Sequence, residues 1–347
     1  MLSKVVQEDI REIARDVDTA LLRGRSVLVA GAAGFLPAYM VETLLHLNDT
    51  QSCGCRVIGL VRNLEKASLR FAHHSGREDF VLIEGDVASL PDTLPSADIV
   101  IHAASPASPK HYGRNPVGVM VANLLGMKNL LDRARCSGAE SFLYFSSGEV
   151  YGQLPGSAPP SKENDYGYVD ILDVRSCYAE SKRASETLGV SYWKQYGVPC
   201  KIVRPFHTYG PGMALDDGRV YADFIADVVN RRNITLKSDG SAVRAFCYLA
   251  DAIRGFFRVL LHGLAGQAYN VGNPNGALSI LELSELLTEM VPGLSVESHA
   301  GPTDAGYLKS PIARNVPDTS LISALGWTPR YSPREGFGRT IRSFQEK

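Results

Sequence analysis

A tyrosine and a lysine four residues apart, Tyr178 and Lys182, form the most chemically suggestive pair in the sequence. If this segment is helical, both side chains lie on one face, and an ammonium group beside a phenol lowers the pKa of that phenol. A phenolate near neutral pH can take a proton from an alcohol, and the phenol can return it to a ketone. Ser147 can donate a hydrogen bond to the same substrate oxygen. We therefore expect oxidation and reduction at a hydroxyl-bearing carbon, with Ser147, Tyr178 and Lys182 as catalytic residues.

A glycine-containing loop lies upstream of this pair. Gly31-Ala-Ala-Gly34-Phe-Leu-Pro37 follows an apolar segment directly and opens a stretch that reads as a helix. In that position glycines let the backbone approach a pyrophosphate, and the free N–H groups at a helix start face the anion. The Tyr-x-x-x-Lys spacing alone often occurs by chance, but together with this loop it predicts an enzyme that binds NAD or NADP. An ordinary glycine-rich turn is the alternative interpretation of the loop.

The end of the second apolar segment bears on the choice between the two coenzymes. An acidic residue there binds the adenosine ribose and favours NAD, whereas an arginine can accommodate the 2′-phosphate of NADP. The segment ends at Arg62, which favours NADP slightly, although a solvated surface charge is the alternative. Asp86 and Val87, after the third segment, are expected near the adenine. The remaining predicted coenzyme contacts are Gly31, Gly34, Phe35, Leu36, Ala103, Ala104, Ser105, Tyr178 and Lys182.

Short segments rich in valine and isoleucine must position these residues. They alternate with helical stretches and lie at 26–30, 56–61, 80–83, 99–102, 142–145 and 201–203. Strands that are apolar throughout and separated by helices form a parallel sheet covered on both faces. We therefore expect an α/β fold with a Rossmann-type doubly wound parallel sheet. Ser147 then lies at the carboxyl end of a central strand, where ligands of this fold bind.

Three regions are expected along the chain. Residues 1–25 carry apolar side chains at helical spacing and predict a leader helix that ends at Gly24. Residues 26–205 form the dinucleotide-binding domain, with a contribution from about 243–272, because Ala250–Leu261 looks helical and can pack back on the sheet. Residues 206–347 form a smaller C-terminal α/β domain that binds the substrate.

Composition excludes several classes of protein. A formal net charge of −1 gives no global basic field, so we expect neither a nucleic-acid partner nor a membrane partner. The acidic N-terminus does not match a signal peptide, and residues 27–33 are too few to span a bilayer, which predicts a cytoplasmic protein. The 6 cysteines are too few for a disulfide scaffold, and Cys53 and Cys55 lack the two-residue gap of a zinc knuckle. We expect all of them to be reduced, and no metal site.

An ordered series of motifs identifies a family resemblance that runs from about residue 26 to 275. The series resembles the extended short-chain dehydrogenases that modify nucleotide sugars, and within them it is most similar to the UDP-glucuronate decarboxylases, also called UDP-xylose synthases. Related dTDP-glucose 4,6-dehydratases share the pattern of oxidising C4, acting on the ketone and reducing it again. The motifs are Ala103-Ala-Ser-Pro-Ala-Ser-Pro109, Ser146-Ser-Gly-Glu-Val-Tyr-Gly152, Tyr178-Ala-Glu-Ser-Lys182, Arg204-Pro-Phe-His-Thr-Tyr-Gly-Pro-Gly212, Asp217-Gly-Arg-Val220 and Ser238-Asp-Gly-Ser-Ala-Val-Arg-Ala-Phe-Cys-Tyr248.

The resemblance implies roles for particular residues. It implies that Ser147 and Tyr178 are the hydroxyl partners of C4 and that Glu149 is the acid or base near C5. It also implies that Lys182 adjusts the pKa of the Tyr178 phenol and binds the ribose. Arg244 neutralises the substrate diphosphate or stands near the group lost in decarboxylation, and a guanidinium suits either task. A structural ion pair is the alternative for both Glu149 and Arg244. Asp217-Gly-Arg219 and the loop before it are expected to touch the nucleotide, and a plain turn is the alternative there. The predicted substrate-binding residues are Ser108, Glu149, His207, Arg219 and Arg244.

Three positions depart from the family pattern. Pro37 replaces the third glycine of the phosphate loop, which is tolerable in the first turn of a helix. Gly148 stands where dehydratases carry an aspartic acid and decarboxylases a serine, so 4,6-dehydration loses its usual general acid and decarboxylation loses one contact. His207 replaces an asparagine that helps to hold the substrate; it can still donate a hydrogen bond, or it is only a packed loop residue.

These departures leave several functions open. The main hypothesis is decarboxylation of a UDP-glucuronate-like substrate through a 4-keto species. The first alternative is NADPH-dependent reduction of a dTDP-4-keto-6-deoxyhexose, for example to dTDP-fucose, which needs no acid at Gly148 and suits Arg62. A 4,6-dehydratase or epimerase, and a coenzyme-sensing regulator without turnover, are further alternatives. By analogy with the family we also expect a homodimer that pairs through residues 117–134 and 178–195.

Overall fold

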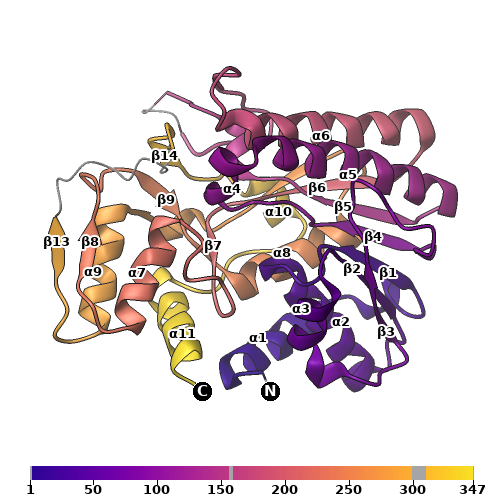
Figure 1. Cartoon of the computed structure of the whole chain (residues 1–347), viewed down its shortest axis with the longest axis horizontal. Coiled ribbons are helices and arrows are strands. Elements are labelled where there is room, and N and C mark those ends of the chain that lie inside the picture. The colour runs from indigo at the N-terminus through magenta and orange to yellow at the C-terminus, as the bar shows by residue number, and fades with distance from the viewer. Residues whose placement is uncertain (1, 156–158, 299–309, 347) are drawn as a thin grey trace.

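A parallel sheet of seven strands forms the centre of the computed structural model, which describes residues 2–155, 159–298 and 310–346 (Figure 1). Every neighbouring pair is parallel, and the strand order is β11-β6-β5-β4-β1-β2-β3. This confirms the predicted doubly wound α/β fold. The strands are β1 Ser26–Ala30, β2 Arg56–Val61, β3 Phe80–Glu84, β4 Ile99–His102, β5 Ser141–Phe145, β6 Cys200–Pro205 and β11 Ala268–Val271.

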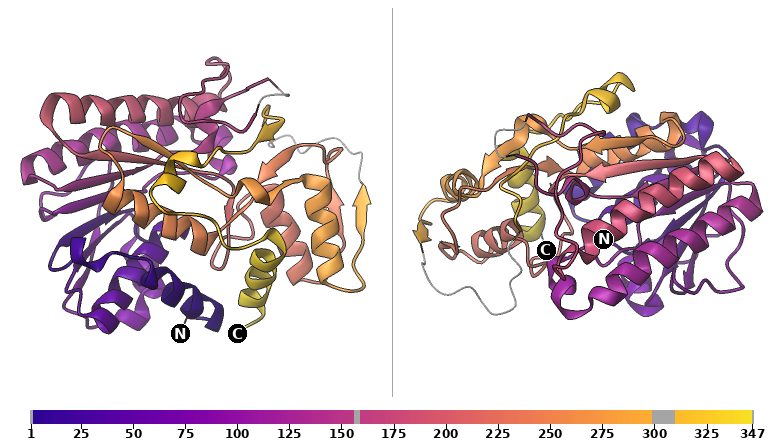
Figure 2. Two further views of the ribbon diagram at one scale, coloured as in Figure 1. Left: turned by 180° about the vertical axis from the view of Figure 1, so that it is seen from behind. Right: turned by 90° about the horizontal axis from the view of Figure 1, so that it is seen from above.

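Helices cover both faces of this sheet, as Figures 1 and 2 show. The long helices α5 (Pro116–Ser137) and α6 (Ser176–Tyr196) lie side by side on one face. The other face carries α2 (Phe35–Gln51) and α8 (Leu249–His262), with α1 (Lys4–Arg15) packed against them. Both faces therefore exclude water, which explains why the strands are apolar throughout.

A smaller region is built mainly from the later part of the chain and lies beside the carboxyl ends of the strands (Figure 1). Its helices are α7 (Val220–Val229), α9 (Ile280–Met290) and α11 (Pro333–Gln345), and its short strands pair as β12-β9-β14, β13-β8 and β10-β7. These strands are β7 Thr208–Tyr209, β8 Ile234–Leu236, β9 Val243–Ala245, β10 Cys247–Tyr248, β12 Ala277–Ser279, β13 Val296–Ser298 and β14 Arg314–Asn315. The remaining elements are α3 Leu64–Arg70, α4 Pro109–Arg114, α10 Ser320–Ala324 and the 3-10 turns η1 Thr19–Leu21, η2 Ala72–His74, η3 Gly148–Tyr151 and η4 Pro274–Gly276.

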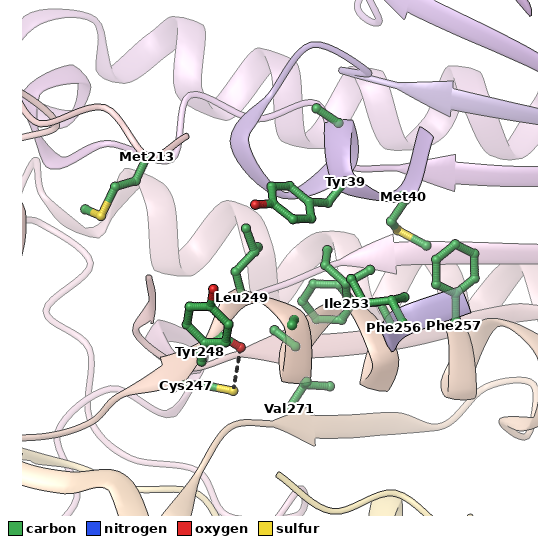
Figure 3. Close-up of a cluster of buried hydrophobic side chains, with 14 of the residues drawn as sticks. Tyr39, Met40, Met213, Cys247, Tyr248, Leu249, Ile253, Phe256, Phe257 and Val271 are labelled. Carbon is green, nitrogen blue, oxygen red and sulfur yellow. Dashed lines mark hydrogen bonds between the residues drawn. The ribbon is translucent and has the colours of Figure 1, made fainter. Parts of the chain in front are cut away.

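The core continues from the sheet to the helices on either side of it. Figure 3 shows side chains of α2, including Tyr39 and Met40, meeting those of α8, including Ile253 and Phe256, with Val271 of β11 beneath them. Burial of a side chain of this size contributes about 1.5–3 kcal/mol. The segment before residue 272 thus belongs to the core of the sheet, although the domain boundaries themselves stay predictions. In the described part of the chain no helix is long and apolar enough to cross a membrane.

The leader helix is shorter than the sequence predicts. Helix α1 ends at Arg15 instead of continuing to Gly24, and η1 follows it. The physical reason is the set of polar contacts at its end. Asp16 is the C-cap, and its carboxylate accepts hydrogen bonds from Arg254 (2.6 Å) and Arg330 (2.7 Å), which turn the chain away from the helical path.

Asp9 ties this helix to the C-terminal helix, and its replacement with alanine is expected to destabilise the fold. The side chain is fully buried and accepts hydrogen bonds from Tyr248 and from Arg339 of α11, both at 2.7 Å. Removing Asp9 leaves the buried Tyr248 hydroxyl and the Arg339 guanidinium without this shared partner, at a cost of about 3 kcal/mol. Burial raises the pKa of Asp9 from 3.8 to about 6, so its contribution to stability falls as the pH rises through this window, and urea unfolding at pH 5 should show a larger loss than at pH 8.

Glu8→Ala is the matched control for Asp9→Ala. Glu8 pairs with the same arginine at 3.2 Å, but its side chain is 53% exposed. Exposed pairs contribute at most about 1 kcal/mol, so the control should unfold within that margin of the wild type. Equal losses from the two variants would contradict the burial argument.

Candidate active site

Most of the predicted site residues line one pocket of about 430 Å³ at the carboxyl ends of the strands. The sheet brings them together because its strands are parallel, so their following loops gather at one edge. The predicted residues that line it are Gly34, Phe35, Leu36, Ala103, Ser105, Ser108, Ser147, Glu149, Tyr178, Lys182, His207, Arg219 and Arg244. Gly31, Arg62, Asp86, Val87 and Ala104 are not part of its lining.

Tyr178 points into this pocket from α6. Its ring stacks on Tyr112 of α4, with centroids 5.0 Å apart and an interplanar angle of 18°. Burial raises the pKa of Tyr178 above its usual value, while a hydrogen bond from Ser147 and the charge of Arg219 act in the opposite direction. The sequence predicts that Lys182 lowers this pKa. In the structure Ser147 and Arg219 are the groups that lower the pKa of Tyr178, and burial outweighs them, so this pKa is raised overall.

Lys182 lies one helical turn after Tyr178 and is buried in the interior of the site. Its Nζ donates a hydrogen bond to the carbonyl oxygen of Phe145 at 2.6 Å and is 5.7 Å from the centre of the Tyr178 ring. Burial lowers the pKa of Lys182 to about 7. The amine can therefore exchange a proton near neutral pH while the carbonyl of β5 fixes its position.

Lys182→Met is expected to make the protein more stable at pH 7 although it removes a predicted catalytic residue. The pKa of about 7 lies below that of an exposed lysine, so between pH 7 and about 10 the unfolded chain binds more protons. The contribution of this group to stability consequently rises with pH across that window. Replacing such a buried charge with an apolar side chain stabilises a fold by about 1–4 kcal/mol, and this gain should shrink towards pH 10.

Urea unfolding of Lys182→Met at pH 7 and pH 10 measures this effect. Lys194→Met is the control, because Lys194 is on the same helix but exposed, and it should change little at either pH. A Lys182→Met variant that is less stable than the wild type at pH 7 would show that the hydrogen bond to Phe145 outweighs the burial of the charge.

Glu149 has a partner that sequence reasoning missed. Its carboxylate accepts a hydrogen bond from Arg175 at 3.0 Å, and both side chains line the pocket. The Arg175 guanidinium also lies 5.9 Å from the centre of the Tyr112 ring, and its Nε is buried without a partner in the described residues. Burial alone would lower the pKa of Arg175, but the charge and hydrogen bond of Glu149 outweigh it and raise this pKa. The available signal was the position of Arg175, three residues before Tyr178 and so on the same helical face.

The aromatic ring of Phe206 lies close to Gly148. A Cβ atom added at position 148 would lie 3.1 Å from the nearest atom of that ring, which is tighter than ordinary contact. Phe206 is itself almost fully buried and lines the same pocket. The place of the aspartic acid or serine in the resembling families is therefore crowded here by an apolar ring, which would have to move by a few tenths of an ångström to admit a side chain.

Basic and polar groups surround the other end of the pocket. His207 adopts a φ of 20°, and its Nε2 is buried without a partner in the described residues; burial lowers its pKa well below the usual value, so the ring is neutral. Arg219 pairs with Asp217 at 3.2 Å, and the Ser108 hydroxyl donates to the Asp217 carbonyl oxygen at 2.5 Å. Arg244 donates to the Ile312 carbonyl oxygen at 2.7 Å. This end is suited to an anionic ligand.

The loop after β1 fits a dinucleotide. Gly31 has a φ of 81°, and a Cβ atom there would lie 2.8 Å from the Ala104 Cα, so a side chain would force the two loops apart. Gly34 is the N-cap of α2, whose first N–H groups have no partner within the helix. The hydroxyl of Ser105 is buried without a partner in the described part of the chain. These donors can hold a diphosphate and the groups attached to it.

Arg62, Asp86 and Val87, three of the residues predicted to bind the coenzyme, lie outside the pocket lining. Arg62 is exposed immediately after β2, and Asp86 is exposed after β3, where its carboxylate accepts a hydrogen bond from the Ala88 amide at 2.8 Å. Val87 is buried and packs against Gly126 of α5. The roles of Arg62, Asp86 and Val87 in binding a coenzyme stay predictions.

Known proteins with similar sequences agree with this arrangement. The model of the NAD dependent epimerase/dehydratase family matches residues 27–272. UDP-glucuronic acid decarboxylase 2 of Arabidopsis thaliana is 34% identical over 326 residues, which is 94% of this chain and 69% of that protein. UDP-glucuronic acid decarboxylase 5 of the same plant is 35% identical over 313 residues, 89% of this chain and 86% of that protein.

Solved structures with the same fold act on nucleotide sugars. A dTDP-glucose 4,6-dehydratase from Streptomyces venezuelae with NAD bound has a TM-score of 0.78 at 25% identity, with 93% of this chain and 97% of that chain covered. A UDP-glucuronic acid 4-epimerase from Bacillus cereus, in complex with UDP-glucuronic acid and NAD, has a TM-score of 0.77 at 22% identity, with 92% and 99% covered. At 22% identity the second likeness concerns the fold alone.

Proposed function

Because the chain belongs to the NAD dependent epimerase/dehydratase family, we propose that it is an NAD(P)-dependent enzyme that decarboxylates UDP-glucuronic acid through a 4-keto sugar. The observation that carries the proposal is the similarity to UDP-glucuronic acid decarboxylases over most of the chain. The pocket supports it, because Ser147, Glu149, Tyr178 and Lys182 all line one cavity.

The first step is proton removal from the C4 hydroxyl. Tyr178 takes this proton as C4 is oxidised, and Ser147 donates a hydrogen bond to the C4 oxygen. Lys182 stays in place through its hydrogen bond to the Phe145 carbonyl oxygen. When bound, the dinucleotide supplies hydride transfer at C4. Gly34 and the start of α2 would hold its diphosphate, and Lys182 would bind its ribose.

Loss of CO2 follows from the ketone at C4. The substrate is then a β-keto acid, so the C5–C6 bond breaks and its electron pair moves towards the C4 oxygen. The hydroxyl groups of Ser147 and Tyr178 stabilise the negative charge that develops there. The Glu149 carboxylate takes a proton from solvent and passes it to C5, and Tyr178 returns its proton to the C4 oxygen when C4 is reduced.

The basic end of the pocket binds the substrate diphosphate in this proposal. Arg219 and Arg244 supply guanidinium groups, Ser108 supports the loop around Asp217, and the neutral His207 offers its Nε2, which has no partner among the described residues. For the coenzyme, the exposed Arg62 after β2 favours NADP slightly over NAD. Comparing turnover supported by each purified coenzyme tests that preference.

A direct assay tests decarboxylation. The purified protein is incubated with UDP-glucuronic acid and a catalytic amount of oxidised coenzyme, and both CO2 release and the mass of the nucleotide sugar are followed. The proposal requires CO2 and a UDP-pentose without net consumption of coenzyme. Turnover that leaves the mass of UDP-glucuronic acid unchanged would instead indicate epimerisation.

The contact between Gly148 and Phe206 favours a second candidate function. Decarboxylases of the resembling group carry a serine at this position, and its loss matters less to an enzyme that only reduces a 4-ketone. NADPH-dependent reduction of a dTDP-4-keto-6-deoxyhexose needs Ser147, Tyr178 and Lys182 and no donor at position 148. Stoichiometric loss of NADPH with that substrate, together with no CO2 from UDP-glucuronic acid, would select this candidate.

The proposed enzyme is a homodimer that pairs through α5 and α6. Large apolar side chains of α5 are exposed although the helix is otherwise well packed, namely Val117, Met120 and Leu125. Burying such a surface against a second copy removes it from water. Light scattering coupled to size-exclusion chromatography measures the mass, and a monomer at micromolar concentration would contradict this part of the proposal.

A further inference from the structure

A second group of potentially reactive side chains lies outside the pocket, where the helix that follows the glycine loop meets the segment before β3. Glu42 belongs to α2, and His73 and His74 end η2, before β3 begins. Nε2 of His73 is 2.9 Å and 3.1 Å from the two carboxylate oxygens of Glu42, and Nε2 of His74 is 2.7 Å from one of them. The proposed function uses none of these residues.

We propose that Glu42, His73 and His74 form a binding site for a divalent transition-metal ion, with Zn²⁺ as the best match. Two imidazole nitrogens and one carboxylate oxygen are a ligand set that zinc accepts in proteins, with a fourth position left for water. In the described part of the chain, this is the one group of three such side chains whose ligand atoms lie within 4.8 Å of one another.

The distances between the ligand atoms support this assignment. Metal–ligand bonds of about 2.0–2.1 Å at angles between 90° and 109° separate two ligand atoms by about 2.8–3.4 Å. The observed separations of 2.7–3.1 Å between histidine nitrogens and carboxylate oxygens lie within a few tenths of an ångström of that range. Small side-chain movements therefore suffice to admit an ion.

Burial makes the site ordered yet accessible. The side chains of Glu42, His74 and His73 are 7%, 12% and 25% exposed, so the carboxylate lies deepest and His73 borders the solvent. The two imidazole rings are 4.2 Å apart and tilted by 45°, which lets both Nε2 atoms face the same carboxylate. An ion can enter beside His73 and replace the hydrogen bonds to Glu42 with coordination bonds.

One nearby charge opposes a cation. Arg70 of α3 is close enough to Glu42 for the two charges to interact. A bound divalent ion is repelled by this guanidinium, so we expect micromolar rather than nanomolar affinity and several-fold tighter binding in Arg70→Gln. Because the ion would join α2 to the segment before β3, it would also raise the melting temperature of the protein.

Calorimetric titration of the untagged full-length protein with Zn²⁺ tests the site independently of any enzymatic activity. Glu42→Gln, His73→Ala and His74→Ala should each weaken binding by at least about tenfold and reduce the zinc-induced rise in melting temperature. Mg²⁺ should not compete, because it prefers oxygen ligands. His262→Ala is the control and should bind as the wild type does, since His262 at the end of α8 pairs with Asp18 and is not part of the cluster.

Crystals soaked in Zn²⁺ and measured at the zinc absorption edge locate the ion. An anomalous peak between Glu42, His73 and His74 supports the proposal even if one of the variants folds poorly. The proposal is overturned if the peak lies elsewhere, if the wild type binds no more tightly than the three variants, or if the melting temperature does not respond to Zn²⁺ in the wild type.

Discussion

Tyr178→Phe is expected to lower kcat on UDP-glucuronic acid by about 10²–10⁴-fold, the usual contribution of a positioned acid–base group. The variant keeps the ring that stacks on Tyr112 at 5.0 Å and removes only the hydroxyl group that bonds to Ser147. Coenzyme binding and the free energy of unfolding should therefore stay close to those of the wild type. Steady-state kinetics, coenzyme titration and urea unfolding of the same preparation measure the three quantities.

The pH dependence of Tyr178→Phe separates a chemical role from a structural one. Burial raises the pKa of Tyr178 above its usual value of about 10, so the phenolate becomes populated only in the alkaline range. The wild-type kcat/KM should rise with pH on this limb, and the residual activity of the variant should lack it. Tyr192→Phe serves as control, because Tyr192 lies on the same helix and donates a hydrogen bond to Asp132 at 2.7 Å. A Tyr178→Phe enzyme with wild-type kcat would contradict the proposed proton path.

The sequence was sufficient to predict the parts of the site that depend on local spacing. Tyr178 and Lys182 are one helical turn apart, and the loop from Gly31 to Gly34 joins a strand to a helix, so both patterns are readable along the chain. The parallel sheet was also predictable, because strands buried on both faces are apolar throughout. Alignment of those strands then brings distant loops to one edge, which explains why Ser147 and Tyr178 meet.

What the sequence could not predict depends on contacts between distant segments. Nothing in the sequence near Gly148 reveals that the ring of Phe206 crowds its side-chain position. The direction of the pKa shift of Tyr178 depends on how deeply α6 is buried, which no spacing reports. The predicted end of the leader helix was wrong for the same reason. Asp16 ends the helix by binding Arg254 and Arg330, which are more than 200 residues away in the sequence.

Glu149→Gln is expected to lower kcat by about 10²–10⁴-fold, because an amide cannot deliver the proton that C5 requires after CO2 leaves. The substitution preserves the shape of the side chain and can still accept a hydrogen bond from Arg175, so KM should change less than kcat. Glu180→Gln is the matched control. Glu180 pairs with Arg183 of the same helix, α6, at 3.1 Å, and it does not line the pocket. Its substitution should leave turnover unchanged.

Combining Glu149→Gln with Arg175→Gln identifies how the arginine contributes. If Arg175 acts by holding the Glu149 carboxylate at 3.0 Å, the double variant should be no slower than Glu149→Gln alone, because the arginine then has nothing left to position. Arg175→Lys should retain more activity than Arg175→Gln, since a cation remains beside the carboxylate. If the two losses instead multiply, Arg175 contacts the substrate directly. Its buried Nε, which has no partner among the described residues, would then point to the C6 carboxylate as the group that Arg175 binds.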